Sequence, residues 1–235
     1  MERDKIYFIG ISVDVMGYGV LSLSDVVLDR LYCPQIRERF GKVRLIIVCG
    51  DVPYYYMEYI QTQLNVPLYY VRGNHSPAIE HTGGGPKVEP QGGVDLHCRA
   101  VNHGGLLLAG VEGSLRYNRG SFQYTQSEMW QNVARLVPAL LFNRLIHGRY
   151  LDIFVSHAPP WGIHDQPDPT HQGVRAFRWL LKVFKPAYHF HGHIHLLRPD
   201  ALRVTQFHRT LVINSYGFYE TDLQLPTPAM NKKRD

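Results

Sequence analysis

Seven short apolar runs, spaced along the chain with longer polar segments between them, constrain the fold of this sequence most strongly. The runs are Gly19–Leu23, Val43–Cys49, Pro67–Val71, Leu106–Val111, Leu151–Val155, Ala187–His191 and Leu211–Asn214. Each is as long as a buried β-strand, and most of the gaps are long enough to hold a helix. This alternation predicts an α/β fold with fully buried strands at its centre.

Two of the gaps carry the pattern of an amphipathic helix. The segment Ser127–His147 follows Thr125, which with Glu128 forms the sequence signature of a capping box. The segment Val174–Phe184 places apolar residues on one stripe at helical spacing. In contrast, 76–93 is rich in glycine and proline, so we expect a long loop there without extended regular structure.

The composition is that of a globular protein of one domain. The chain has 235 residues, of which 45% are hydrophobic and 19% are charged. The formal net charge of +5 mildly favours anionic partners. The three cysteines lie far apart with no CxxC spacing, which argues against a disulfide framework or a thiolate zinc site and favours a cytoplasmic location. No apolar run approaches the roughly 20 residues of a membrane span.

Four of the apolar runs end in polar residues of metal-binding type. The polar residues that follow them are Asp51 after the second run, Arg72, Asn74 and His75 after the third, His157 after the fifth, and His193 and His195 after the sixth. Ligands of α/β sheets bind beyond the carboxyl ends of the strands, so we expect these side chains to converge. Alone, the Gly-Asp and Asn-His endings are more simply turns, and His157 could equally just end a strand. The cluster from His191 to His195 is the most specific of the four, and the occurrence of all four in this order indicates a site.

The donor types in this set are carboxylate, amide oxygen and imidazole. Without thiolates they suit manganese, iron or zinc better than a structural cysteine-zinc centre. One carboxylate accompanied by several imidazoles suits a pair of metals, which in such sites lie ~3.5–4 Å apart and clamp the oxygens of a displacement at phosphorus.

These motifs resemble those of the calcineurin-like metallophosphoesterase superfamily, which read D-x-H, G-D, G-N-H-D/E, a histidine near small residues and proline, and G-H-x-H. The resemblance extends from about Gly19 to Leu223, and it implies one domain over 1–235 in which 1–18 and 224–235 are peripheral. It also implies a two-sheet sandwich of mixed strands flanked by helices. The implied activity is the hydrolysis of phosphate mono- or diesters by a hydroxide that bridges two divalent transition-metal ions.

The resemblance also implies a role for each matching residue. Asp51 bridges both metals, while Asn74, His157 and His193 complete the second site and His195 joins the first. His75 lies near the leaving group as general acid or charge stabiliser. Arg72 holds substrate oxygens, because a guanidinium matches the geometry of phosphate, and Arg116 has either this role or a surface one.

The first motif departs from the family pattern, and two aspartates could fill it. Asp25 and Asp14 are each followed two residues later by a residue other than histidine, namely Val27 and Met16. We prefer Asp25, because it ends an apolar run and its spacing from Asp51 fits one intervening helix. The acidic residue usual after Asn-His is also replaced, by Ser76. Weaker occupancy of the first metal site is expected.

Two rival functions follow from the same residues. A degenerate family member could serve as a protein-binding scaffold, although the retained ligand set argues against it. A nuclease is encouraged by the basic isoelectric point near 9.1, but no basic stripe or nucleic-acid-reading module accompanies it. A phosphorylated small molecule is therefore the expected partner, with no membrane contact and with the oligomeric state left open.

Overall fold

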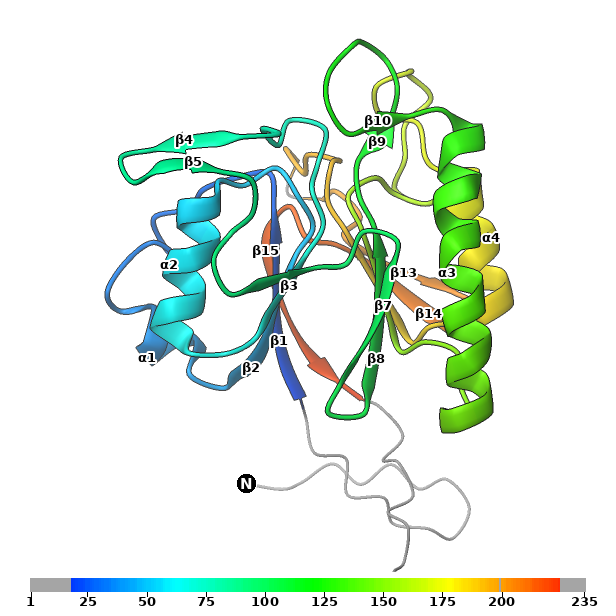
Figure 1. Cartoon of the computed structure of the whole chain (residues 1–235), viewed down its shortest axis with the longest axis horizontal. Helices are drawn as coiled ribbons and strands as arrows, with labels where there is room; N and C mark the ends of the chain where they lie inside the picture. The colour runs from blue at the N-terminus through cyan, green and yellow to red at the C-terminus, as the bar shows by residue number, and fades with distance from the viewer. Residues whose placement is uncertain (1–17, 199, 225–235) are drawn as a thin grey trace, which may run out of the picture.

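Two β-sheets, packed face to face, form the centre of the computed structural model, which describes residues 18–198 and 200–224 (Figure 1). The first sheet has the strand order β15 (Gly217–Leu223), β1 (Tyr18–Ser24), β2 (Val43–Val48), β3 (Leu68–Tyr70) and β6 (Gly93–Asp95). The second has the order β13 (Val204–Phe207), β14 (Thr210–Asn214), β12 (Tyr188–His191), β11 (Ile153–Ser156), β8 (Leu106–Val111) and β7 (Arg99–His103).

Both sheets are mixed, with parallel strands at the centre and an antiparallel strand at every edge except that of β6. In the first sheet β1, β2, β3 and β6 are parallel and β15 pairs antiparallel with β1. In the second, β8, β11, β12 and β14 are parallel, and β7 and β13 are antiparallel to their neighbours. The carboxyl ends of the parallel strands in each sheet therefore emerge at one edge.

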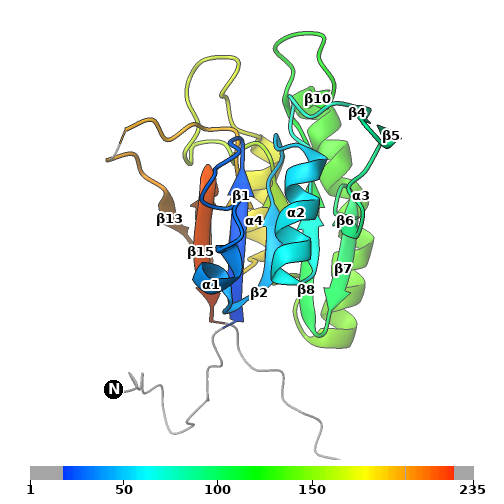
Figure 2. The same cartoon turned by 90° about the vertical axis from the view of Figure 1, so that its left-hand side faces the viewer.

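Helices cover the outer face of each sheet, which gives four layers (Figures 1 and 2). Two helices, α1 (Ile36–Phe40) and α2 (Tyr54–Leu64), pack with the first sheet in one apolar cluster. The other two, α3 (Gln126–His147) and α4 (Arg175–Phe184), pack with the second sheet. A third cluster fills the space between the sheets. The two-sheet α/β sandwich predicted from the sequence is confirmed.

The two predicted helices are present where the sequence placed them. Thr125 caps α3: its side chain accepts a hydrogen bond from the backbone N–H of Glu128, and the Glu128 side chain accepts one from the backbone N–H of Thr125. In α4 the apolar stripe is buried at Phe177, Leu181 and Phe184. Satisfied N–H groups at the start of α3 and a buried face on α4 explain why both helices were readable from sequence.

The segment expected to be a long loop contains a short hairpin. Strand β4 (Glu80–Thr82) pairs antiparallel with β5 (Gly85–Lys87) across the two-residue connection Gly83–Gly84. A Gly-Gly pair suits a two-residue hairpin connection, which is why glycine-rich sequence holds regular structure here. A further pair of two-residue strands, β9 (Ser114–Leu115) and β10 (Gln123–Tyr124), lies before α3.

No helix among residues 18–198 and 200–224 is long and apolar enough to cross a bilayer. The alternative first-motif residue, Asp14, lies outside the described residues.

Candidate metal centre

The predicted polar residues gather where the carboxyl ends of the two sheets meet. Asp25 follows β1 and Asp51 lies just beyond β2, and these strands run side by side with Leu23 beside Val48. His157 follows β11 of the second sheet. One carboxylate oxygen from each aspartate and one ring nitrogen of His157 all lie within 4.8 Å of one another. Three residues from separate parts of the sequence thus form one compact group of potential metal ligands.

The backbone at this group adopts a conformation that most residues avoid. Asp25, Asp51 and His193 have φ angles of +64°, +55° and +67°. A non-glycine residue in the left-handed region costs free energy, and such residues concentrate at functional sites where the surroundings enforce them. In each case the residue with positive φ lies shortly after the end of a buried strand, and the chain turns sharply there.

Two glycines let neighbouring loops approach these side chains closely. A Cβ added at Gly192 would lie 2.7 Å from Oδ2 of Asp25, and one added at Gly73 would lie 2.7 Å from Cε1 of His157. Both distances are too short for non-bonded atoms, so only glycine fits at these positions. The glycines of the Gly-Asn-His and Gly-His-x-His motifs therefore serve to close the loops around the site.

Two acceptor atoms face the Nε2 atom of the His157 ring. The Nδ1 atom lies 2.7 Å from the carbonyl oxygen of Cys49, which can only accept, so Nδ1 carries a proton. The Nε2 atom lies 2.9 Å from Oδ1 of Asn74 and 3.1 Å from Oδ2 of Asp51. In a neutral ring, Nε2 would direct a lone pair at two further lone pairs. With the Asn74 amide in this orientation, a cation among the three atoms, either the proton of a charged imidazole or a metal ion, satisfies all of these lone pairs.

Asp51 and His157 each stabilise the charged form of the other inside the protein. Burial opposes the charge on Asp51, but the His157 ring and the His75 backbone N–H outweigh burial and lower the pKa of Asp51 to about 2. Burial likewise opposes a charge on His157, but Asp51 and Asp25 outweigh it and raise the pKa of His157 to about 9. The site therefore attracts a cation strongly enough to overcome desolvation.

Asp51 has one carboxylate oxygen fixed and the other available. Its Oδ1 accepts hydrogen bonds from the His75 backbone N–H, at 2.9 Å, and from the Ser76 hydroxyl, at 3.3 Å. Its Oδ2 is buried and faces Nε2 of His157, at 3.1 Å, the position shared by a proton or a metal ion. A buried carboxylate oxygen that faces only a ring nitrogen able to bind metal suits coordination, so the donor set fits the divalent ions that the sequence implies.

Asp25 and His193 are linked directly. The Asp25 side chain is 3% exposed, and its Oδ2 accepts a hydrogen bond of 3.0 Å from the His193 backbone N–H. Burial raises the pKa of Asp25. The His193 ring packs edge-on to His157, and its Nε2 donates to the carbonyl of Thr170 at 2.8 Å. Because Nε2 is protonated, Nδ1 is the His193 nitrogen free to bind a metal, and burial lowers the pKa of this histidine to about 3.

His195 and His75 lie at the exposed side of the group. The Nε2 atom of His195 is 3.9 Å from Oδ1 of Asp25, and its side chain is 53% exposed. His75 is also exposed, and its Nε2 lies 3.4 Å from the hydroxyl of Tyr117. The same hydroxyl accepts a hydrogen bond of 2.9 Å from Nδ2 of Asn74. Tyr117 thus connects two predicted site residues, and no sequence motif pointed to it.

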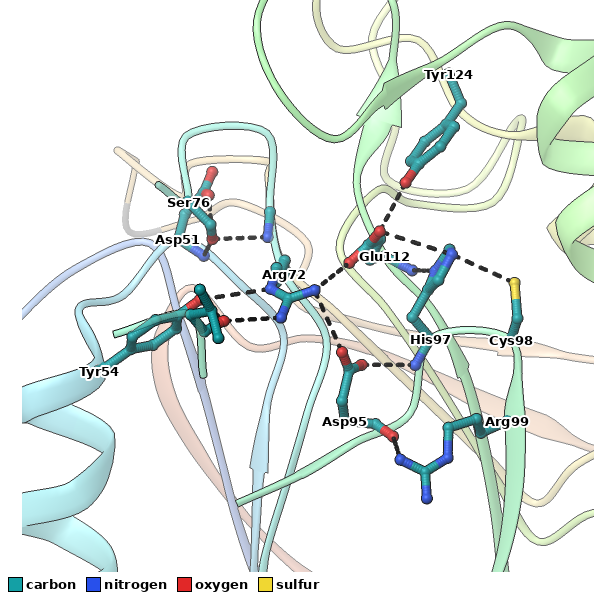
Figure 3. Close-up of polar contacts among 12 residues, drawn as sticks. Asp51, Tyr54, Arg72, Ser76, Asp95, His97, Cys98, Arg99, Glu112 and Tyr124 are labelled. Carbon is teal, nitrogen blue, oxygen red and sulfur yellow. Dashed lines mark hydrogen bonds and ion pairs between the residues drawn. The ribbon is translucent and has the colours of Figure 1, made fainter. Parts of the chain in front are cut away.

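The guanidinium of Arg72 is engaged by groups between the sheets, as Figure 3 shows. It forms ion pairs with Asp95, at 3.4 Å, and with the buried Glu112, at 3.6 Å. It also donates to the Tyr54 hydroxyl and to the Val88 carbonyl. These contacts brace the loop that carries Asn74 and His75, and a direct role of Arg72 on substrate stays a prediction.

Further polar residues around the group have partners of their own in the fold. The His171 ring lies 5.6 Å from that of His193. His164 forms a 2.8 Å hydrogen bond with His191, and Asp165 accepts one from the Gly173 backbone N–H. Arg116 bonds to the Gln123 carbonyl and pairs with Glu128 at the start of α3. Tyr54, Tyr56 and Tyr70 are buried in the apolar cluster of the first sheet.

A family model described as calcineurin-like phosphoesterase matches residues 25–197. The chain belongs to this family. One solved crystal structure has a TM-score of 0.60 at 13% identity over 88% of this chain and 95% of its own. The crystal structure of TT1561 of Thermus thermophilus has a TM-score of 0.51 at 14% identity over 88% of this chain and 99% of its own. No curated protein matches.

Family membership implies a metal-dependent phosphoester hydrolase that acts on phosphorylated substrates. It also implies divalent metal ions, for which Asp25, Asp51 and His157 form a compact candidate group. The likeness to the solved structures, at 13% and 14% identity, shows the fold alone.

The geometry predicts which aspartate of the first motif matters. We expect Asp25→Asn to weaken binding of one metal ion at least about tenfold, the lower end of the effect of changing groups that only support a ligand. We expect Asp14→Asn to bind metal as the wild type does. Elemental analysis and manganese titration of the two variants measure this, and metal loss in Asp14→Asn alone would show that the first motif had been aligned wrongly.

Proposed function

We propose that this protein hydrolyses phosphate mono- or diesters at a centre of two divalent transition-metal ions, with manganese, iron or zinc as the candidates. The observation that carries this proposal is the convergence of His157 Nε2, Asp51 Oδ2 and Asn74 Oδ1 within about one hydrogen-bond length. Such an arrangement of lone pairs is costly unless a cation occupies it. Membership of the phosphoesterase family supports the reaction type.

The proposed ligands divide between the two ions. Asp51 would bridge the ions through Oδ2, since its Oδ1 is already occupied by two donors. Asn74, His157 and His193 would hold one ion, and Asp25 with His195 would contribute to the other. Bound divalent ions supply Lewis-acid stabilisation of phosphoryl oxygens and a water nucleophile at neutral pH. With Val27 where the family has histidine, the first metal site, that of Asp25 and His195, has fewer protein ligands.

The remaining residues would act on the leaving group. His75 is held beside Asp51, because its backbone N–H donates to Oδ1 of that carboxylate, and its side chain is exposed. Its ring would donate a proton to the departing oxygen. Tyr117 would hold the His75 ring and the Asn74 amide in fixed positions, because its hydroxyl contacts both.

Metal dependence tests the proposed function directly. We expect manganese-loaded protein to hydrolyse at least one of three ester classes, namely aryl monoesters, aryl diesters and cyclic nucleotides, and to lose this activity on chelation. Activity should return when manganese is added back. Protein that binds two ions but cleaves none of these esters would favour a scaffold function, and protein that binds no metal would refute the proposed centre.

Replacement of His75 tests the acid role separately from metal binding. We expect His75→Ala to slow turnover of alkyl esters by about 10²–10⁴-fold, the usual contribution of general acid catalysis, and to affect activated aryl esters less. Metal content should stay at the wild-type level. His208→Ala, at another exposed histidine, is the control. Loss of metal from His75→Ala would instead identify His75 as a ligand.

Removal of the Tyr117 hydroxyl tests its positioning role. We expect Tyr117→Phe to lower kcat or metal affinity by about 10–100-fold, as for other groups that orient metal ligands. The acidic or basic limb of the kcat pH profile should also shift, because the His75 ring loses a neighbour. Tyr150→Phe, whose ring packs against Phe184 of α4, is the matched control. Unchanged kcat, pH profile and metal affinity in Tyr117→Phe would contradict the role.

A further inference from the structure

A cavity of about 350 Å³ adjoins the candidate metal centre on the side of His75. Asp51 and His75 both line it, so it opens onto the group expected to protonate the leaving oxygen. A cavity in this position, reached past the proposed acid, is where the alcohol portion of an ester would lie. Its lining therefore bears on which esters the site accepts.

Most of the cavity wall is apolar. Val52, Pro53 and Pro77 contribute side chains that neither donate nor accept hydrogen bonds. Ligand sites typically combine such a wall with a few polar groups that fix orientation. This part of the cavity suits the hydrocarbon body of an alcohol or phenol better than a heavily hydroxylated group such as a sugar.

A second carboxylate, that of Glu80, lines the cavity in addition to that of Asp51, which belongs to the candidate metal centre. Glu80 lies on β4, and its Oε2 accepts a hydrogen bond of 2.8 Å from the backbone N–H of Tyr54, the first residue of α2. Pro53 at the N-cap supplies no side-chain acceptor, so Glu80 takes the place of a capping residue. The hydrogen bond to the helix holds its negative charge at the cavity.

The charge balance of the cavity follows from this contact. A helix N-terminus ordinarily attracts anions, but at α2 the carboxylate of Glu80 already occupies that position. The residues lining the cavity include no lysine or arginine. The nearby cation, Arg72, is paired with Asp95 and Glu112. A second negative charge on the leaving group would therefore meet the fixed carboxylate of Glu80, and no lysine or arginine of the cavity lining would balance it.

We propose that this cavity is the leaving-group subsite and that it selects esters of apolar alcohols whose far end is neutral or cationic over those whose far end is anionic. This selectivity rests on the proposed phosphoesterase function. It assigns Glu80 as a specificity-determining residue, and its position is set by the start of α2 rather than by the metal centre.

The test uses three aryl phosphates that differ only in the charge of the para substituent: 4-(aminomethyl)phenyl, 4-ethylphenyl and 4-(carboxymethyl)phenyl phosphate, each also as its methyl diester. The methylene keeps the acidity of the three phenols similar. For manganese-loaded protein we expect kcat/KM to fall in that order, by about tenfold from the first to the last, as a partly screened charge interaction allows. Glu80→Gln, whose amide oxygen can still accept from the Tyr54 N–H, should bring the ratio close to one.

Glu38→Gln, at an exposed glutamate of α1, is the control and should keep the wild-type ratio. Equal kcat/KM for the three esters in the wild-type protein, or an unchanged ratio in Glu80→Gln, would overturn the subsite. If no ester is cleaved, the proposed function fails instead, and the affinities of the three compounds for wild type and Glu80→Gln decide the subsite. The same charge order in binding, lost in Glu80→Gln, would support it, and its absence would overturn it.

Discussion

The contact between His157 and the first sheet is the interaction on which the site depends. His157 belongs to the second sheet, yet its Nδ1 donates to the carbonyl of Cys49 at the end of β2. That hydrogen bond fixes the tautomer and turns Nε2 toward Asp51 and Asn74. The ring is fully buried, so an unbalanced charge or lone pair there is expensive. Joining the sheets at this point thus creates a position that suits a cation.

The sequence predicted the central strands well, for a physical reason. A strand buried on both faces must be apolar throughout, and the seven predicted runs coincide with β1, β2, β3, β8, β11, β12 and β14 to within two residues at each end. The antiparallel edge strand β15 was missed. Its partly exposed face carries Glu220 and Asp222, which interrupt any apolar run.

Residues that act through tertiary contacts were beyond the reach of motif analysis. Tyr117 lies 43 residues from Asn74 in the sequence, in a loop with no motif, and only the fold brings its hydroxyl to that amide. Arg72 has partners that motif analysis did not supply. Its place beside the Gly-Asn-His motif suggests phosphate binding, which stays a prediction, and its partners Asp95 and Glu112 come from β6 and the end of β8. Their convergence depends on how the two sheets pack.

Ser76 shows how a departure from the family pattern can be accommodated. The acidic residue usual at this position would add a negative charge beside Asp51, whose pKa is already set by burial against two histidines. The Ser76 hydroxyl instead accepts from the backbone N–H of Gly73, at 2.9 Å, and donates to Oδ1 of Asp51. It therefore orients the carboxylate rather than His75. The task of orienting His75 then passes to Tyr117, the neutral group within reach of that ring. Ser76 and Tyr117 thus divide between two neutral hydroxyls the contacts to Asp51 and to the His75 ring.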